Sequence, residues 1–212
     1  MGQFNALVVE GVPGIGKSTV IDALVRRHVA AAPPRKLRTL VHLAQTHTYG
    51  PLAAAEDAGT LTARENRAHL ERITAMMEWL HAGVQNPLHP SCYVLVDTLH
   101  LTHCVRPGII SWSDVEEIDR RLAALDCKVL LLRASTGVVR QRTVDARAET
   151  QFRQYARKFG RTADELHAHF ISEQAILTGL FERSAMPRLA LSNDGAVDDV
   201  LDAADAFWRA ER

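Results

Sequence analysis

A glycine-rich segment between an apolar run and a helical pattern constrains the fold of this chain more than any other feature. Residues 7–19 read Leu-Val-Val-Glu-Gly-Val-Pro-Gly-Ile-Gly-Lys-Ser-Thr, which fills the pattern G-x-x-x-x-G-K-[ST] from Gly11 to Ser18. Glycines let the backbone turn with positive φ and bring its N–H groups against phosphate oxygens, and the open first turn of a following helix adds partial positive charge. An apolar run at 4–9 and helically spaced apolar residues over 19–32 supply the strand and the helix that this motif requires. The segment therefore predicts a nucleotide-phosphate site.

The residue types within this loop have separate tasks. Lys17 reaches the β- and γ-phosphates, and the Ser18 hydroxyl ligates Mg²⁺. A dinucleotide-binding Rossmann loop is excluded, because its glycines follow G-x-G-x-x-G whereas those of this chain follow G-x-x-G-x-G. We expect the nucleotide to contact the whole loop and the start of the helix, namely Gly11, Val12, Pro13, Gly14, Ile15, Gly16, Lys17, Ser18 and Thr19.

Apolar runs alternate with helical patterns along the rest of the chain. The expected strands are 4–9, 37–43, 92–96, 128–132 and 188–191. Helices are expected to begin at three capping boxes, Thr62-x-x-Glu65, Ser113-x-x-Glu116 and Thr162-x-x-Glu165. Alternation of this kind builds βαβ units. We predict a three-layer, doubly wound α/β fold with a five-stranded parallel sheet, in which residues 1–212 form one domain.

Composition excludes several classes of protein. Lys and Arg number 25 and are balanced by 25 Asp and Glu, so the chain has no polyanion-binding character, and we expect neither nucleic acid nor a membrane as a partner. No signal peptide or membrane-spanning run is apparent, and the three cysteines are expected to be reduced thiols, which together predict a cytoplasmic protein. His100 and His103 with Cys104 leave a zinc site open as an alternative, although no second pair completes four ligands.

A phosphate loop requires an acid that holds the water shell of Mg²⁺. Asp97 follows the apolar run 92–96, and the carboxyl ends of parallel strands meet at one edge of the sheet, beside the phosphate loop. We therefore predict that Asp97 and Ser18 form the metal site. A loop aspartate that caps the following segment is the alternative. Glu10, directly before the loop, is expected to face the acceptor or the metal.

A basic stretch follows the fourth expected strand. Arginine suits the transfer of a phosphoryl group, because its guanidinium donates two parallel hydrogen bonds and keeps its charge. We predict a lid over about 136–161, in which Arg142 and Arg147 stabilise the transferring group and Arg140 contacts the substrate. A solvated helix face is the alternative, and it explains Arg153, Arg157 and Arg161. A GTPase is disfavoured, because no Asp-x-x-Gly follows the third strand and no Asn-Lys-x-Asp precedes the last.

In chain order, four segments resemble thymidylate kinases and deoxynucleoside kinases. Residues 9–19 look like the phosphate loops of both groups, which follow Phe/Ile-Glu-Gly, and residues 140–149 are similar to their lids. Residues 64–69, Arg-Glu-Asn-Arg-Ala-His, are similar to the Asp-Arg-x-x-His patch on the acceptor-binding helix of thymidylate kinases. Residues 191–195, Leu-Ser-Asn-Asp-Gly, stand where this superfamily passes a loop over the adenine. The resemblance implies a P-loop kinase that uses ATP and Mg²⁺, with Arg67 at the acceptor and Asn193 at the nucleotide.

The chain departs from both groups where they bind the acceptor. Thymidylate kinases carry Arg-Glu-Pro-Gly after the second strand and Asp-Arg-Tyr after the third, whereas residues 44–49 here read Ala-Gln-Thr-His-Thr-Tyr and residues 97–100 read Asp-Thr-Leu-His. Deoxynucleoside kinases have a catalytic Glu where this chain has Gln45, which cannot act as a base but is still expected to contact the acceptor. The proton of the acceptor would then be removed by Asp97, Glu10 or His47, or positioning of the acceptor beside the γ-phosphate would suffice without a base.

These features predict an ATP-dependent phosphotransferase that acts on a nucleoside monophosphate or a nucleoside. Two alternatives stay open. One is a kinase of another small metabolite or antibiotic on the same frame, and the other is a nucleotide-binding regulatory P-loop protein without acceptor chemistry. The sequence leaves open the acceptor, the general base, the choice between ATP and GTP, and whether the protein is a homodimer.

Overall fold

Five parallel strands form a single sheet, as the alternating pattern predicts. The structure is a computed structural model that describes residues 3–31, 38–84, 91–106, 109–147, 159–160 and 162–210. The strands lie in the order β2-β3-β1-β4-β5. They are β1 (Phe4–Glu10), β2 (Arg38–Leu43), β3 (Ser91–Asp97), β4 (Lys128–Arg133) and β5 (Arg188–Ser192). Each expected strand is confirmed to within one residue at either end.

β1 is the central strand, and its position explains its composition. It pairs with β3 on one side and β4 on the other, so both of its edges and both of its faces are covered. Six of its seven residues are buried, and the strand is continuously apolar from Ala6 to Val9. The register pairs Val9 with Asp97 and Glu10 with Leu131. Both acids therefore reach the same edge of the sheet as the loop that follows β1.

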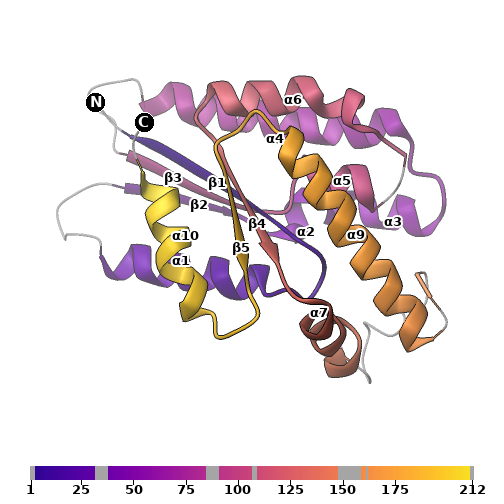
Figure 1. The fold of residues 1–212 in the computed structure, drawn as a ribbon. Helices are drawn as coiled ribbons and strands as arrows, with labels where there is room; N and C mark the ends of the chain where they lie inside the picture. Colours follow the sequence, from indigo (N-terminus) through magenta and orange to yellow (C-terminus); the bar gives the residue numbers. More distant parts are fainter. Residues whose placement is uncertain are drawn as a thin grey trace.

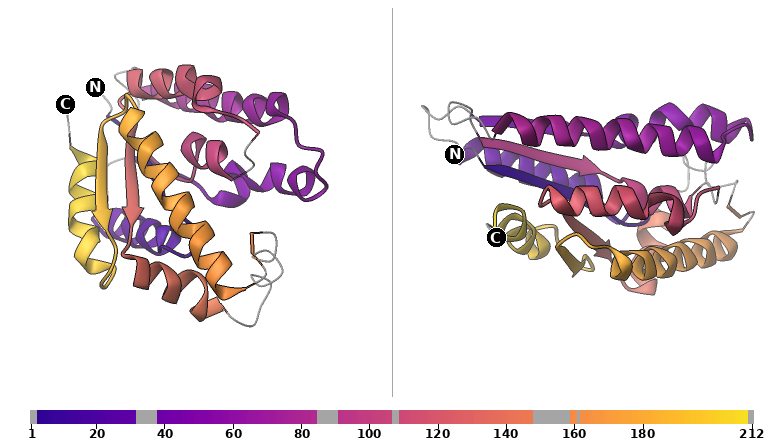
Figure 2. Two further views of the ribbon diagram at one scale, coloured as in Figure 1. Left: turned by 45° about the vertical axis from the view of Figure 1, so that its right-hand side comes forward. Right: turned by 90° about the horizontal axis from the view of Figure 1, so that it is seen from above.

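Helices cover both faces of the sheet and gather at its carboxyl end. On one face α1 (Lys17–Ala30) packs with α10 (Asp198–Arg209), and the other face carries α4 (Ala63–Val84), α6 (Trp112–Ala124) and α9 (Ala163–Arg183) (Figure 1). Four short helices lie at the end toward which the strands point (Figure 2). They are α2 (Gln45–Thr48), α3 (Gly50–Asp57), α5 (His100–Val105) and α7 (Thr136–Thr143), the last followed by the short helix η1 (Asp145–Arg147).

Two of the three expected capping boxes are confirmed and one is displaced. Thr62 and Glu65 exchange hydrogen bonds before α4, and Thr162 with Glu165 does the same before α9. The third prediction was wrong by two residues, because the box uses Ser111 and Asp114 and α6 begins at Trp112. Ser111 has the extended backbone that an N-cap requires, and the nearer acid then falls at the third helical position.

The core lies on both sides of the sheet, and α10 packs over part of it. Trp208 is fully buried, and its indole N–H donates to the backbone oxygen of Asn5 in β1 at 3.1 Å. His28 of α1 and Tyr93 of β3 pack against the Trp208 ring. This aromatic group packs α1 and α10 against the sheet near its amino end. None of the helices in the described residues is long and apolar enough to cross a membrane.

Candidate functional site

The loop between β1 and α1 has a backbone conformation that requires glycine at several positions. Gly11, Gly14 and Gly16 have φ of 148°, 82° and 98°, values that side-chain-bearing residues rarely adopt. A Cβ atom on Gly11 would stand 2.7 Å from the backbone oxygen of Leu132, and one on Gly16 would stand 2.7 Å from the amide nitrogen of Asn193. The loop is therefore pressed between the end of β4 and the segment after β5, and only glycine fits at both positions.

The first turn of α1 is an open anion site. Gly16 is the N-cap, no side chain caps the helix, and its first turn carries no acidic residue. In the described residues, no side chain therefore competes with an anion for the N–H groups and the positive dipole end of this turn. Lys17 Nζ donates to the backbone oxygens of Gly11 at 2.7 Å and Val12 at 3.1 Å, which places its charge above the loop.

Lys17 is held in a setting that lowers the pKa of its ammonium group. Its residue is only 6% exposed. Burial is the largest cause of a pKa lowered to about 8, and the positive charge of Arg106 is the second, opposed by the carboxylates of Asp97, Glu10 and Glu173. The ammonium is still mostly protonated at neutral pH, so it is a desolvated cation whose attraction for a phosphate oxygen is screened little by water.

Ser18 and Asp97 meet as the sequence predicts. Ser18 Oγ donates to Asp97 Oδ2 at 3.2 Å, while Asp97 Oδ1 is buried and accepts no hydrogen bond from the described residues. A buried carboxylate oxygen with no partner is costly, so this atom fits a cation or its water ligands. The donor set, one hydroxyl and one carboxylate, suits Mg²⁺, which keeps most of its waters and takes its remaining ligands from phosphates.

The turn after β3 aims the Asp97 carboxylate. Thr98 has a φ of 61°, which is strained for a β-branched residue, and its N–H donates to the backbone oxygen of Val9 at 3.0 Å. The backbone oxygen of Asp97 accepts hydrogen bonds from the hydroxyls of Thr48 at 2.7 Å and Thr98 at 2.6 Å. The strained turn is thus tied to β1 and to α2, which sets the direction of the carboxylate.

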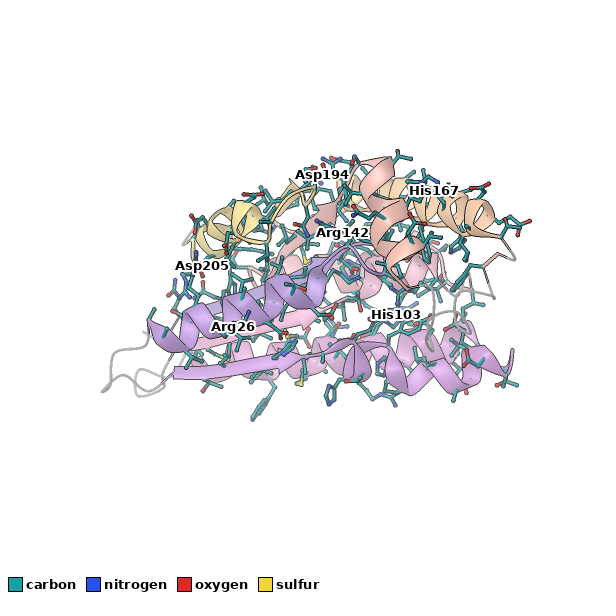
Figure 3. The ribbon with its side chains drawn as sticks, turned by 90° about the horizontal axis from the view of Figure 1, so that it is seen from below. Arg26, His103, Arg142, His167, Asp194 and Asp205 are labelled. Atoms are coloured by element: carbon teal, nitrogen blue, oxygen red, sulfur yellow. The ribbon has the colours of Figure 1, made fainter. Side chains whose placement is uncertain are left out.

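A cavity of about 210 Å³ opens beside the phosphate loop. Asn193 lines it, and its side-chain nitrogen donates to the backbone oxygen of Ile15 at 2.7 Å. Figure 3 shows Arg142 and Asp194 close to each other, near the middle of the view. The lining residues come from the phosphate loop, α1, α7 and the segment after β5, and they are Gly14, Gly16, Thr19, Arg142, Asn193, Gly195 and Val197.

Arg142, which was predicted to stabilise the transferring group, lies in the wall of this cavity. Its guanidinium donates to the backbone oxygens of Asn193 at 2.6 Å and Gly195 at 2.9 Å. Both carbonyls belong to the segment after β5, so Arg142 joins α7 to that segment instead of pointing to the loop lysine. Arg142 lies in the last turn of α7, and this turn borders the cavity.

The other predicted arginines of the lid do not reach the site in the described residues. Arg140 was predicted to contact substrate, but it is exposed and its Nη1 donates to Asp164 of α9 at 2.8 Å, with Asp145 at 3.9 Å. That expectation was wrong, because Arg140 holds α7 to the start of α9. The side chain of Arg147 lies outside the described residues, as do Arg153, Arg157 and Arg161. The predicted lid is described only over 136–147 and 159–160.

Glu10 and Gln45 occupy different positions from those expected. Glu10 is fully buried, and its two carboxylate oxygens accept hydrogen bonds from the N–H of Leu99 at 2.9 Å and the hydroxyl of Thr102. It therefore anchors α5 to β1 and does not face an acceptor, which corrects the prediction. Gln45 begins α2 and is half-buried at the carboxyl end of the sheet, while His47 is exposed.

Arg67, which was predicted at the acceptor, lies on the exposed face of α4, whereas its neighbours Asn66 and His69 are buried. Arg67 is exposed, 3.8 Å from Glu71 on the same helix. Asn66 and His69 share the opposite, buried face of α4 and contact α5 and α2. The helical period separates them, since residues 66, 69, 70 and 73 fall on one face and residue 67 is turned away from it. The helical period of the sequence could therefore have identified Asn66 and His69 as residues of the buried face of α4.

A buried polar cluster missed by the sequence analysis lies behind Asp97. His69 Nε2 and His103 Nε2 both donate to the backbone oxygen of Thr48, at 2.8 Å and 3.0 Å. Burial, followed by the neighbouring His69, lowers the pKa of His103 to about 3, so its ring is neutral. With Nε2 as the donor, Nδ1 is an acceptor, and the Asn66 amide 2.6 Å away satisfies it when its nitrogen faces the ring.

The alternative zinc site is not assembled by the residues around it. His100 Nε2 donates to Asp119 at 2.9 Å, whereas His103 bonds to Thr48 and Asn66, so the two rings serve different networks. Burial raises the pKa of the Cys104 thiol to about 12, and the three cysteines are free thiols. Within the described parts of the chain, no group of three or more His, Cys, Asp or Glu side chains is arranged to hold a metal ion.

Comparison with known proteins agrees with this architecture. No protein-family model matches the chain, and no curated protein matches it. Among solved structures, the chain is similar to the YorR protein of Bacillus subtilis in complex with phosphorylated GDP, with a TM-score of 0.60 at 12% identity over 98% of this chain and 99% of that one. It is also similar to a gluconokinase from Sinorhizobium meliloti 1021, with a TM-score of 0.55 at 13% identity over 96% of this chain and 91% of that one. The fold of this chain is thus similar to the folds of these two proteins along nearly its whole length.

Proposed function

We propose that this protein is a P-loop kinase that transfers the γ-phosphoryl group of ATP to a small-molecule acceptor. The observation that carries the proposal is the alignment of three features along one edge of the sheet. An uncapped α1 with Lys17 folded over the loop suits the β- and γ-phosphates. The Ser18–Asp97 pair suits Mg²⁺, and the cavity bounded by Arg142 and Asn193 suits the base and ribose. The phosphate loop, the Ser18–Asp97 pair and the cavity therefore match the phosphates, the metal ion and the nucleoside of a nucleoside triphosphate.

The residues divide the work of transfer. Lys17 and the loop N–H groups bind the phosphates, and Ser18 with Asp97 would hold Mg²⁺, which supplies charge neutralisation on the phosphate oxygens when bound. An oxygen of the acceptor donates the electron pair of the new P–O bond, while the γ-phosphorus–oxygen bond breaks with its pair left on ADP. If the acceptor is a hydroxyl, its proton passes to Asp97 or to water. Arg147 keeps its predicted role at the transferring group.

The acceptor class that we favour is a nucleoside monophosphate or a nucleoside. Support comes from the resemblance of the phosphate loop to thymidylate and deoxynucleoside kinases and from the similarity to YorR, a protein solved with a guanine nucleotide. GTP is therefore tested beside ATP as the donor. The similarity to a gluconokinase favours a second candidate, a kinase of a polyhydroxy metabolite on the same frame. The altered residues 44–49 and 97–100 are compatible with either acceptor.

The test is a screen for labelled product. The protein is incubated with γ-labelled ATP or GTP and Mg²⁺, together with nucleosides, nucleoside monophosphates, sugar acids or aminoglycosides. We expect one class to yield a phosphorylated product. The Lys17→Ala variant should lose at least about a hundredfold in turnover, because it removes a preorganised cation from the phosphates, and should keep its fold. Tight nucleotide binding with slow hydrolysis and no labelled product from any class would favour the regulatory protein instead.

A further inference from the structure

Thr48, the last residue of α2, lies directly behind the aspartate of the candidate metal site. Thr48 is fully buried, and its hydroxyl donates to the backbone oxygen of Asp97 at 2.7 Å, across 49 residues of the chain. α2 has only four residues, yet it places this hydroxyl on the end of β3 that carries the carboxylate. The contact is therefore a tertiary link between α2 and the metal site.

The backbone that Thr48 contacts is held in a strained conformation. Thr98 has a φ of 61°, and such a conformation of a β-branched residue persists only where the surrounding contacts fix it. The N–H of Thr98 donates to the Val9 oxygen at 3.0 Å and fixes the turn from β1. The Thr98 hydroxyl also donates to the Asp97 oxygen, at 2.6 Å, but it belongs to the turn and moves with it. The Thr48 hydroxyl therefore anchors the Asp97 peptide from outside the turn.

Two buried imidazole rings fix Thr48 itself. Nε2 of His69 in α4 and Nε2 of His103 in α5 donate to its backbone oxygen, at 2.8 Å and 3.0 Å. The two histidines are 7% and 0% exposed, so water competes little for these bonds. A carbonyl oxygen has two lone pairs, and the two rings engage both. Thr48 thus joins two helices, through its carbonyl, to the Asp97 turn, through its hydroxyl.

Other fully buried threonines in helices bond differently. The hydroxyls of Thr74 in α4 and Thr143 in α7 donate to the carbonyl four residues earlier, at 2.9 Å and 2.6 Å, which is the usual local solution for a helical hydroxyl. The Thr48 hydroxyl is directed at a remote carbonyl instead. A valine at position 48 would fill a similar volume but would leave the Asp97 oxygen, within the described part of the chain, with the Thr98 hydroxyl only.

We propose that Thr48 is a positioning residue of the metal site, whose hydroxyl fixes the Asp97 peptide so that the carboxylate faces Ser18 and a bound Mg²⁺. This inference rests on the proposed kinase function. It gives α2, whose first residue Gln45 was predicted to contact the acceptor, a task at the metal. The Thr48 hydroxyl acts through Asp97 alone, so its loss should weaken the contribution of the metal more than the binding of the nucleotide itself.

The experiment separates the metal from the nucleotide. The dissociation constant of ADP is measured in EDTA and in saturating Mg²⁺, and the wild type should bind ADP more tightly with Mg²⁺. Thr48→Val should lose about tenfold of that gain, while its affinity for ADP in EDTA stays within about twofold of the wild type. Thr48→Ser keeps the hydroxyl and should retain the gain. Thr74→Val is the matched control, because it removes a buried hydroxyl that bonds only within α4 among the described residues.

A second readout needs no ligand. The Thr98 N–H donates to Val9, so its rate of hydrogen exchange in the free protein reports how firmly the turn is held. This exchange should be at least about tenfold faster in Thr48→Val and unchanged in Thr74→Val. His69→Leu removes one of the two bonds to the Thr48 carbonyl and should change both readouts in the same direction, by less. That variant provides the test if Thr48→Val does not fold.

The outcomes separate this inference from the proposed function. A full Mg²⁺ gain or an unchanged Thr98 exchange rate in Thr48→Val would overturn the role of Thr48 and leave the kinase proposal standing. If the Mg²⁺ gain and the exchange rates follow these expectations but no acceptor yields a phosphorylated product, the kinase proposal fails and the role of Thr48 stands. Absence of nucleotide binding by the wild type would overturn both.

Discussion

At the scale of single residues, the candidate site depends on atoms that the protein leaves without a protein partner. The N–H groups of the first turn of α1 have no side-chain cap, and Asp97 Oδ1 is buried without a hydrogen bond in the described part of the chain. Proteins pair such groups wherever a partner is available, because a buried unpaired polar atom costs about 1–3 kcal/mol. Both features are therefore best understood as binding groups for phosphate and for a cation.

Asp97→Asn tests the cation at this scale. The amide keeps the size of the side chain and accepts the Ser18 hydrogen bond, but it removes the negative charge. Turnover should fall by about tenfold or more and the Mg²⁺ concentration for half-maximal activity should rise. Asp119→Asn is a matched control, since it alters another buried aspartate that bonds to His100 on α5. If the Mg²⁺ dependence of Asp97→Asn equals that of the wild type, another acid holds the metal.

At the scale of elements, α7 links one wall of the cavity to α9. Arg142 joins it to the segment after β5, and Arg140 joins it to α9. At its start, the Gln174 side chain of α9 bonds both the N–H and the oxygen of Ala134, each at 3.0 Å. A further bond runs from His167 to the oxygen of Thr136. α7 is therefore anchored at its beginning by α9 and at its end by the cavity wall.

This anchoring predicts a binding effect for Arg142. Replacing Arg142 by methionine should weaken ATP binding by about tenfold, because two charge-assisted bonds that shape the cavity are lost, whereas kcat at saturating ATP should change less. Arg188→Met is the matched control, since Arg188 also donates to two backbone oxygens, both at 2.7 Å, at the start of β5. A fall in kcat with unchanged ATP affinity would return Arg142 to the predicted catalytic role.

At the scale of the whole molecule, a buried polar seam joins three helices in the interior. Thr48, His69, His103 and Asn66 join α2, α4 and α5 behind the Asp97 turn. Burial disfavours the charged form of the His103 ring, because protonation would place a positive charge in the interior next to His69. The seam thus couples the stability of the fold to pH at the place where α2, α4 and α5 meet.

The pH dependence has a definite sign. The pKa of His103 is about 3 in the folded protein, below the ordinary value near 6.5, so the unfolded chain takes up the proton first as pH falls. Stability contributed by the neutral ring is fully present above about pH 6.5 and is lost toward pH 3, at about 1.4 kcal/mol per pH unit. Urea unfolding of the wild type and His103→Gln at several pH values measures this slope.

The free energy of unfolding should depend less steeply on pH in His103→Gln, because about one proton fewer is taken up on unfolding. This difference in slope is expected even if the variant is less stable at every pH. His47→Gln is the control, because His47 is exposed in α2. Equal slopes for His103→Gln and the wild type would show that the His103 ring does not titrate on unfolding.

The sequence by itself determined the strands, the phosphate loop and two of the three helix caps that it predicted. These features are local: an apolar run of one strand length, glycines at positions of positive φ, and a serine or threonine three residues before an acid all express their structure within a few residues of the chain. The meeting of Ser18 with Asp97 was also predictable, because parallel strands bring their carboxyl ends to one edge whatever else the fold contains.

Only the tertiary structure decided where the long charged side chains point. Arg142 bonds to carbonyls 51 and 53 residues away, Arg106 is paired with Glu173 on another helix, and Arg67 and Arg140 turn to acids on the surface. Glu10 is likewise bonded to Leu99, 89 residues distant. An arginine or a glutamate can extend in many directions from the same backbone, and its partner is chosen by the packing of elements that are remote in sequence. Residue type and spacing place such a side chain on an element, while the neighbouring elements determine its task.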